Sequence, residues 1–457
     1  MRYLPSSLVL SLFLAGPLAA QTPVPAPSPA TSPAPVAANA PSPVLIQRAD
    51  DVVRILNGEG DIAAIFAPEF LAQVPPAAIR QLSGQIAGQL GRALRVTGLV
   101  PRDALSGAAV IGFERGTARI KLVVGAGGKI SGLLISGIEP ATSAALTTLD
   151  AVAAEFRKLP GKTAFSVEPL GGPPVRGAPT PRGAQTGAQV APDTALAIGS
   201  SFKLVILAEL VRQIDAGQRK WDDAITLDGH ELPGGGYTQK PAGTRVPLRE
   251  LAEAMIKISD NSATDLLLFT LGRERVEAMA TRLGWGSPLN RPFLGTMEVF
   301  KLKGAFNGAL GRRYAAETLS GKRYLLAGEV AATPGSAIGA LFADGKPVRI
   351  DTLEWFASPR ELAGTMRWFK DHTTPAGVEA RRILSINPGP LAGMGDTFGY
   401  IGYKGGSEPG VISMTLLLRD KANRWSAVSA SWNNPAAAID ELAFTALVRR
   451  AAQLVAQ

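Results

Sequence analysis

Hydrophobic and polar positions follow first a helical and then a strand period in the part of the chain after residue 43. Apolar residues recur at helical spacing over residues 47–56 and 77–94. They then alternate with polar or small residues over residues 109–114, 118–124 and 130–135, which is typical of half-buried strands. The pattern predicts a small α+β unit, helices first and strands second, that ends near residue 160.

The C-terminal part of the chain shows further helical patterns and ends with two strands and a helix. Strand patterns cover residues 411–418 and 425–431, and a helical pattern covers residues 436–456. A segment rich in glycine, proline and alanine at residues 171–192 is typical of a domain linker. The strand-like residues 163–167 before it, however, also fit the domain that follows. We therefore expect a second, larger domain whose N-terminal boundary the pattern leaves open.

The first 43 residues are predicted to lie outside both domains. Residues 1–20 have the features of a secretory signal, with Arg2, an apolar stretch and a small-residue cleavage site before Gln21. Residues 21–43 hold eight prolines among alanine, serine and threonine, which is typical of an extended, semi-rigid linker. We expect an exported protein, periplasmic or secreted, without a lipid anchor because no cysteine follows the signal.

Length and composition narrow the classes of protein. The chain has 457 residues, too many for one hydrophobic core, which agrees with a first domain at residues 44–160 and a second at residues 161–457. Cysteine is absent and only two histidines occur, which excludes disulfides and cysteine-ligated metals and argues against histidine zinc sites and Ser–His–Asp triads. We expect neither a metal nor another cofactor. No later apolar run reaches the length of about 18 residues that a membrane-spanning helix needs, so stable membrane insertion is not expected.

The net charge of +9 bears on the partners of the protein. Lysine and arginine are spread along the chain, which indicates an ordinary solvated basic surface. The alternative is a weak attraction to anionic polymers or lipid surfaces of the cell envelope. Nucleic acid is not expected as a partner of an exported protein.

One short motif introduces candidate chemistry. Ser200 and Lys203 stand at the start of an almost wholly apolar helical pattern, which must be buried. Residues three apart share a helix face, so the two side chains can touch at the first turn. The positive end of the helix dipole disfavours a protonated amine and favours a developing oxyanion, and both effects help a lysine to activate a serine. Taken alone, the motif also fits a serine N-cap followed one turn later by a lysine.

Two further motifs follow in the sequence. The Ser-Asp-Asn motif at residues 259–261 stands between two helical patterns, where it suits either a helix N-cap or a loop that presents a hydroxyl and an amide to a site. The Lys-Gly-Gly motif at residues 404–406 precedes the strand pattern at residues 411–418. It suits either a turn before a hairpin or an edge strand whose glycines let a substrate backbone approach.

In this order the three motifs resemble the signature of serine β-lactamases and penicillin-binding proteins, SxxK, SDN and K-T-G. The spacing of 59 residues between Ser200 and Ser259 is similar to that of class A β-lactamases. The resemblance covers residues 163–457. It implies an α+β fold in which a helical lobe lies beside a five-stranded antiparallel sheet, with the site between them.

The resemblance implies a catalytic role for three of the matching residues. Ser200 is the expected nucleophile that becomes acylated, and Lys203 is its base or proton relay. Ser259 is expected to pass the proton to the leaving group. The shortage of histidine is consistent with this machinery, which uses none.

The remaining matching residues are expected to bind the substrate. Asn261 would help to hold the catalytic lysine and the substrate amide, and Lys404 would attract the substrate carboxylate. The backbone N–H groups of Ser200 and Ser407 would form the oxyanion hole. Gly406 would let the substrate backbone approach the strand.

The sequence departs from the family pattern in two places. Gly405 replaces the usual threonine and removes a hydroxyl that binds the substrate carboxylate, with Ser407 as a nearby substitute at a different position. The interval between the first residues of the second and third motifs is 145 residues, longer than in compact class A enzymes, and the excess lies around residues 291–354. We find no clear E-x-x-L-N motif, the usual source of the deacylating base. Glu298 is the nearest candidate by position.

The sequence thus predicts an exported serine hydrolase that acts on β-lactams or related esters and amides through an acyl-enzyme, with atypical deacylation. An esterase and a peptidoglycan-directed peptidase with a peptide-like substrate are alternatives within this class. A non-catalytic envelope binding protein that keeps the fold is the alternative from another class. The first domain resembles the ketosteroid-isomerase-like or cystatin-like domains that precede related serine hydrolases.

Overall fold

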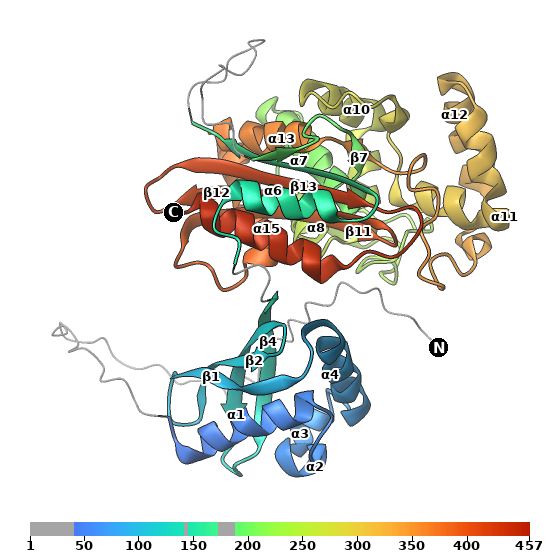
Figure 1. Cartoon of the computed structure of the whole chain (residues 1–457). Helices are drawn as coiled ribbons and strands as arrows, with labels where there is room; N and C mark the ends of the chain where they lie inside the picture. The colour runs from blue at the N-terminus through green and yellow to red at the C-terminus, as the bar shows by residue number, and fades with distance from the viewer. Residues whose placement is uncertain (1–40, 141–144, 172–187) are drawn as a thin grey trace, which may run out of the picture. The chain divides into compact units, whose positions relative to one another are not determined.

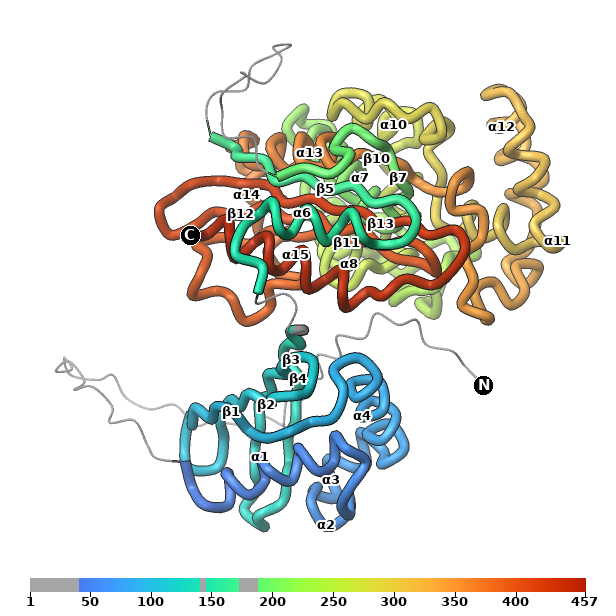
Figure 2. Tube along the Cα trace, viewed as in Figure 1, coloured from blue at the N-terminus to red at the C-terminus, as the bar shows by residue number. Residues whose placement is uncertain are grey.

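The computed structural model describes residues 41–140, 145–171 and 188–457. The predicted signal at residues 1–20 and most of the predicted proline-rich linker at residues 21–43 lie outside the described residues. The chain divides into two compact units, Met1–Ala145 and Leu146–Gln457. The elements of each unit can be followed in Figure 1 and Figure 2.

The N-terminal unit consists of helices and a four-stranded antiparallel sheet. Among its helices, α1 contacts the sheet most extensively. The Ser42 hydroxyl caps α1 by accepting a hydrogen bond from Leu45 N at 3.2 Å. The apolar face of α1 and the inner face of the sheet share one hydrophobic core. The helices are α1 (Pro43–Leu56), α2 (Ile62–Ile65), α3 (Pro68–Leu71) and α4 (Pro76–Leu90), and the strands, paired in sequence order, are β1 (Ala93–Pro101), β2 (Ser106–Phe113), β3 (Gly116–Val124) and β4 (Ile130–Pro140).

The predicted order of helices before strands is confirmed in this unit, with one strand that the pattern missed. The predicted helix at residues 77–94 ends at Leu90, and β1 begins three residues later. Gly91 separates them with a φ of +76°, and a Cβ here would lie 2.5 Å from Glu114 Oε2, so only glycine fits the turn. Leu94 continues the apolar spacing of the helix although it is exposed in the strand, which concealed the change of period.

The C-terminal unit contains the expected five-stranded antiparallel sheet, in the order β11-β12-β13-β5-β6. The predicted strand at residues 163–167 is part of it, because β5 pairs along its whole length with β13. The sheet therefore joins the two ends of this unit's sequence. Its strands are β5 (Lys162–Pro169), β6 (Gln189–Val190), β11 (Phe398–Glu408), β12 (Val411–Asp420) and β13 (Trp425–Asn433).

Helices cover both faces of this sheet, as Figure 1 and Figure 2 show. On one face α6 and α15 form a core with the strands, and on the other face the sheet packs against a lobe of helices around the buried α7. This is the α+β arrangement that the resemblance implies, a helical lobe beside a sheet. The helices are α6 (Leu149–Lys158), α7 (Lys203–Asp215), α8 (Leu248–Lys257), α9 (Asn261–Leu271), α10 (Arg273–Arg282), α11 (Thr296–Ala316), α12 (Leu319–Leu325), α13 (Pro359–Asp371), α14 (Pro375–Ser385) and α15 (Glu441–Val455).

Shorter elements connect the lobe and the sheet. The 3-10 turn η1 (Gly199–Phe202) leads directly into α7. Two-residue strands β7 (Leu196–Ala197) and β10 (Phe356–Ala357) pair just before it. The other short elements are β8 (Ala224–Thr226), β9 (Arg245–Pro247), η2 (Pro288–Asn290), η3 (Leu326–Val330), η4 (Gly335–Ile338) and η5 (Gly389–Leu391). Within the described residues, no helix is long and apolar enough to cross a membrane.

The boundary between the units lies earlier than the predicted boundary between residues 160 and 161. Helix α6 belongs to the C-terminal unit, where Phe156 stacks on Phe165 of β5 with ring centroids 4.6 Å apart and meets Phe444 of α15 edge-on at 5.6 Å. The glycine- and proline-rich segment at residues 171–192 contains β6, which pairs with β5, so the two sides of this segment belong to the same sheet and it does not separate domains. The sequence shows that α6 is amphipathic but not which core its apolar face joins.

We predict that the C-terminal unit needs α6 for stability. A chain of residues 161–457 lacks the buried side chains of Val152 and Phe156, whose burial stabilises by roughly 3–6 kcal/mol together. Compared with a chain of residues 146–457, its free energy of unfolding in urea should be lower by about that amount. Equal unfolding midpoints of the two chains would show that α6 is an accessory of the unit rather than a part of its core.

Candidate active site

Ser200 lies in the turn η1, immediately before the buried helix α7. Lys203 is the first residue of α7, so the two motif residues stand one turn apart at the start of this helix. Ser200 is partly exposed, whereas Ser201 and Phe202 beside it are buried. The turn therefore presents one serine, the predicted nucleophile, at the edge of the lobe.

Contacts from distant parts of the chain hold this turn in place. The side-chain amide of Asn433, at the end of β13, accepts a hydrogen bond from Ala197 N at 2.8 Å and donates one to Ala197 O at 2.9 Å. The carbonyl of Trp355 accepts a hydrogen bond from Ile198 N at 3.0 Å. The Trp355 ring also stacks on Phe202, with the centroids 3.6 Å apart. The backbone is thus fixed on both sides of the predicted nucleophile.

The turn packs backbone against backbone on β11. Gly199 has a φ of +48°, and a Cβ on it would lie 3.1 Å from Ser407 N. A Cβ on Gly406 would lie 2.2 Å from Ser200 N. Glycine is therefore required at both positions, since a side chain at either would push the two segments apart. The two backbone N–H groups that the resemblance assigns to an oxyanion hole stand on these adjoining segments.

Lys203 is fully buried, and its Nζ atom contacts three oxygen atoms of the Ser-Asp-Asn motif. It donates hydrogen bonds to Ser259 O at 2.7 Å and Asn261 Oδ1 at 2.7 Å, and lies 3.1 Å from Ser259 Oγ. A neutral amine has two N–H donors and one lone pair. All three oxygens can accept from an ammonium group, and the hydroxyl can instead donate to a neutral amine, so the arrangement accommodates Lys203 in either form.

The electrostatic surroundings of Lys203 favour its neutral form. Burial, and after it the positive charge of Lys404, hold the pKa of Lys203 well below its usual range. The carboxylates of Asp265 and Asp260 act in the opposite direction. A lowered pKa leaves more of the lysine neutral, and the neutral amine is the form that can accept a proton in catalysis.

The Ser259 hydroxyl lies between the two lysines of the motifs. Lys404 Nζ, buried on β11, contacts Ser259 Oγ at 3.1 Å and also the carbonyl of Gly405. Burial lowers the pKa of Lys404 to about 7. Ser259 itself has a φ of +58°, a strained conformation for a residue with a side chain, and such strain is concentrated at functional sites. The Nζ atoms of Lys203 and Lys404 each lie within hydrogen-bond distance of this hydroxyl, so the three groups form a path that a proton can follow.

Both interpretations of the Ser-Asp-Asn motif apply, each to different residues. Asp260 is the N-cap of α9, since its Oδ1 atom accepts hydrogen bonds from Ala263 N at 2.8 Å and Ser262 Oγ at 2.6 Å. Ser259 and Asn261, on either side of it, direct oxygen atoms at Lys203. The rigid cap thus places the two polar neighbours.

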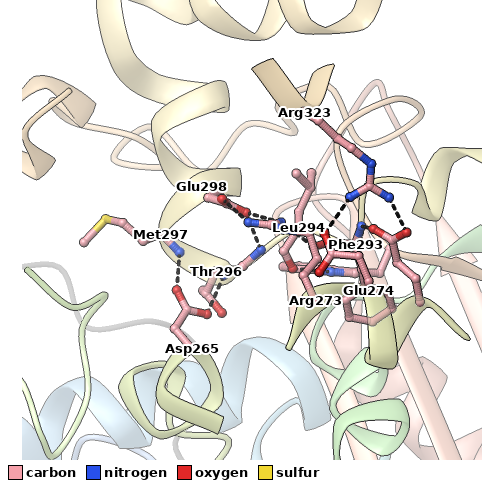
Figure 3. Close-up of polar contacts among 12 residues, drawn as sticks. Asp265, Arg273, Glu274, Phe293, Leu294, Thr296, Met297, Glu298 and Arg323 are labelled. Carbon is pink, nitrogen blue, oxygen red and sulfur yellow. Dashed lines mark hydrogen bonds and ion pairs between the residues drawn. The ribbon is translucent and has the colours of Figure 1, made fainter. Parts of the chain in front are cut away.

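Asp265 is a residue of the site's surroundings that sequence reasoning missed. It lies one turn after Asn261 on α9, fully buried, and accepts hydrogen bonds from Thr296 N at 2.6 Å and Met297 N at 2.9 Å at the start of α11 (Figure 3). Burial raises the pKa of Asp265 to about 6, against the lowering effect of these two N–H groups. Its spacing of four residues from Asn261 was the signal available in the sequence.

Its position in the sequence made Glu298 the nearest candidate for the deacylating base, but its contacts do not fit that role. Its carboxylate forms a two-pronged ion pair with Arg273, at 2.6 and 2.8 Å, and accepts a hydrogen bond from Gly295 N at 2.8 Å (Figure 3). Both oxygens are therefore engaged in fixing the start of α11 to α10. Such a carboxylate is poorly suited to take a proton from water.

The departure at Gly405 has a steric reason in the structure. A Cβ at this position would lie 2.1 Å from Tyr403 Oη and 3.1 Å from Ser413 O on β12. A threonine would require Tyr403 to move. The Tyr403 side chain therefore occupies the space in which the family pattern has a threonine side chain.

Two further observations concern a cavity away from the motifs and the possibility of a metal site. The described part of the chain contains a cavity of about 670 Å³ lined by Arg381, Tyr400, Arg419 and Trp425 among others, and none of the predicted site residues lines it. In the same part of the chain, no group of three or more histidine, aspartate or glutamate side chains is arranged to hold a metal ion.

Comparison with known proteins agrees with the motifs. Residues 151–331 match the model of a family described as the beta-lactamase enzyme family. The match begins within α6, includes the first two motifs and ends before Lys404. Over these residues, the match agrees with the resemblance to serine β-lactamases that the motifs predicted. A comparison with curated protein sequences finds no match.

Solved structures similar to this chain include two β-lactamases and a penicillin-binding protein. The β-lactamase from Sphaerobacter thermophilus is 18% identical, with a TM-score of 0.45 over 67% of this chain and 94% of that chain. The β-lactamase from Chitinophaga pinensis is 16% identical, with a TM-score of 0.44 over 68% of this chain and 98% of that chain. PBP-A is 15% identical, with a TM-score of 0.45 over 67% and 93%.

Proposed function

We propose that the protein is a serine hydrolase that forms an acyl-enzyme on Ser200 with β-lactams or related esters and amides. The observation that carries the proposal is the convergence of the three motifs on the Ser259 hydroxyl, which lies 3.1 Å from both Lys203 Nζ and Lys404 Nζ. Ser259 is 56 positions from Lys203 and 145 positions from Lys404 in the sequence, and both lysines are buried. The match to the beta-lactamase family supports the same class of reaction.

The proposed acylation follows from this arrangement. The Ser200 oxygen attacks the carbonyl carbon of the substrate while its proton passes to neutral Lys203. The negative charge that develops on the carbonyl oxygen is stabilised by the N–H groups of Ser200 and Ser407, on segments that Gly199 and Gly406 bring together. The proton then passes through Ser259 to the leaving group as the old bond to the carbonyl carbon breaks.

We propose that hydrolysis of the acyl-enzyme is the weak step for β-lactams. General-base activation of water contributes about 10²–10⁴-fold, and it requires a carboxylate that is free to accept a proton. Glu298 is engaged by Arg273 and Gly295 instead. Esters with good leaving groups and less crowded acyl-enzymes should therefore be turned over faster than penicillins.

Intact-protein mass spectrometry after incubation with a fluorescent penicillin tests the proposed function. We expect one stoichiometric adduct on the wild-type protein, with slow loss of the label, and faster steady-state turnover of a p-nitrophenyl ester than of a chromogenic cephalosporin. An esterase or a peptidoglycan-directed peptidase is then distinguished by its substrates. A protein that binds these compounds without any covalent adduct is the non-catalytic binding protein of the alternative hypothesis.

The charge of Lys404 predicts a fall of kcat/KM with rising pH for anionic substrates but not for neutral ones. Lys404 is protonated below its pKa of about 7 and neutral above it, so attraction of a substrate carboxylate is present below pH 7 and lost above it. For an anionic β-lactam, kcat/KM for acylation should fall by up to about tenfold per pH unit above this value. A neutral p-nitrophenyl ester should not show this fall. The measurement is kcat/KM for both substrates against pH, and equal profiles would contradict the role of Lys404.

Export to the periplasm or the outside of the cell is part of the proposal. It is supported by the signal-like residues 1–20, with a positive start, an apolar stretch and a small-residue cleavage site before Gln21. Detection of a mature N-terminus at Gln21 in a secreted or periplasmic fraction would test it. The net charge of +9 makes weak contact with anionic envelope polymers a further expectation.

A further inference from the structure

A buried cluster of three charged side chains lies outside the three motifs. Lys303 of α11 contacts Glu354 Oε1 and Glu408 Oε1 with its Nζ atom, each at 2.5 Å. The side chains are 0%, 1% and 10% exposed in that order. We refer to these three residues as the Lys303 cluster. Its members come from the long segment between the second and third motifs and from the last residue of β11.

The charges of the Lys303 cluster do not balance when both acids are ionised. Two carboxylates face one ammonium group, and Glu354 Oε2 has no hydrogen-bond partner among the described residues. Burial, and after it the charge of Glu354, raise the pKa of Glu408 well above its usual range, while the two carboxylates raise the pKa of Lys303. Burying such a group costs more in desolvation than an apolar replacement of similar size, so its benefit lies in fixing positions rather than in adding stability.

Both acids of the cluster adjoin residues that hold the site. Glu408 follows Ser407, whose backbone N–H faces the Ser200 turn. Glu354 precedes Trp355, which binds Ile198 N and stacks on Phe202. Lys303 therefore joins the two segments, β11 and the Trp355 segment, that contact the Ser200 turn from different sides. A displacement of either acid is transmitted through a single peptide unit.

We propose that Lys303 is a positioning residue of the site, which binds Glu354 and Glu408 and thereby fixes the distance between the Ser407 N–H and the Ser200 turn. This inference rests on the proposed acylation of Ser200. It gives the long segment around α11 a function, because α11 carries the cation that joins the two walls of the site. Lys303 lies in the first, helical part of α11, just before residues 305–308, where the backbone is not helical.

The substitution Lys303→Met tests the proposal, with Lys301→Met as the matched control. Lys301 is on the same helix and is also buried, at 7% exposed, but no hydrogen bond or ion pair joins its side chain to a described residue. We expect Lys303→Met to lower the rate of acylation by a fluorescent penicillin about 10²-fold, because the oxyanion N–H groups separate. The carbonyl stretching frequency of the acyl-enzyme, measured by infrared difference spectroscopy, should rise as these hydrogen bonds weaken. Lys301→Met should change neither.

A second variant and a second measurement separate positioning from folding. Glu408→Gln keeps an oxygen for Lys303, so it should acylate within about threefold of wild type, whereas Glu408→Leu should resemble Lys303→Met. Amide hydrogen exchange of residues 398–410 should rise in Lys303→Met and stay unchanged in Lys301→Met. A lower melting temperature in Lys303→Met, with the rate, the carbonyl frequency and the exchange of this strand unchanged, would overturn the proposal.

Failure of the proposed function gives a different result. If wild type forms no adduct, the acylation of Ser200 is refuted, and the exchange measurement alone decides on the Lys303 cluster. Increased exchange of residues 398–410 in Lys303→Met then still supports positioning of β11. Unchanged exchange refutes it.

Discussion

Replacing Ser200 with alanine is expected to abolish acylation by any reactive acyl donor, by about 10⁴-fold or more. Ser200 is the partly exposed serine of the η1 turn, its backbone lies against Gly406, and Lys203 follows one turn later at the start of α7. The hydroxyl of its neighbour Ser201 is buried. The fold should persist because the substitution removes one partly exposed oxygen atom. The measurement is the rate of adduct formation by intact mass.

The neighbouring Ser201 provides the matched control. Ser201 is fully buried and donates a hydrogen bond to Ser413 Oγ at 3.3 Å on β12. Ser201→Ala should cost about 1 kcal/mol of stability and leave the adduct in place. An adduct on Ser200→Ala, or one that maps to Ser259, would refute the assignment of the nucleophile.

Replacing Lys203 with methionine is expected to lower the acylation rate by about 10²–10⁴-fold. Methionine keeps most of the buried volume but removes the group that accepts the Ser200 proton. In wild type the acylation rate should rise with pH as Lys203 loses its proton, and the lowered pKa places this rise below the usual range of a lysine. In Lys203→Met this limb of the pH profile should be absent.

A second substitution distinguishes a base from a simple cation at this position. Arginine stays protonated in proteins, so Lys203→Arg should be as inactive as Lys203→Met if Lys203 acts as a neutral base. Recovery of activity in Lys203→Arg would show that only the positive charge matters. Lys257→Met, at the exposed end of α8, removes a lysine without touching the motifs and should behave as wild type.

Local spacing was sufficient to predict part of the site. Ser200 and Lys203 are three residues apart at a helix start, so helix geometry alone predicts that they share one face. Ser259 and Asn261 flank the N-cap Asp260, and their common direction toward Lys203 is set by the turn, which spacing does not predict. Only the resemblance predicted that the first and second motifs lie in contact and that Lys404 joins them. No periodicity connects residues 145 positions apart.

The residues that hold the site could not be predicted from the sequence. Asn433 and Trp355 are ordinary residue types in ordinary strand and loop patterns, and their contacts with the Ser200 turn exist only in three dimensions. The same is true of Lys303, whose position on α11 suggests a surface residue until Glu354 and Glu408 are brought to it. Helix α6 was assigned to the wrong unit for the same reason, since amphipathicity does not identify the partner core.

The pairing of Asn433 with Ala197 has a consequence for the synthesis of the protein. The two residues are 236 positions apart, and β13, which ends at Asn433, also pairs with β5 at the beginning of the unit. A ribosome therefore releases Ser200 and Lys203 more than 200 residues before the strand that holds their turn, since Asn433 follows Ala197 by 236 positions. Because the sheet cannot close before β13 is made, the nascent polypeptide carries these two residues without the contacts that fix their turn. The proposed site is thus assembled only after β13 has left the ribosome.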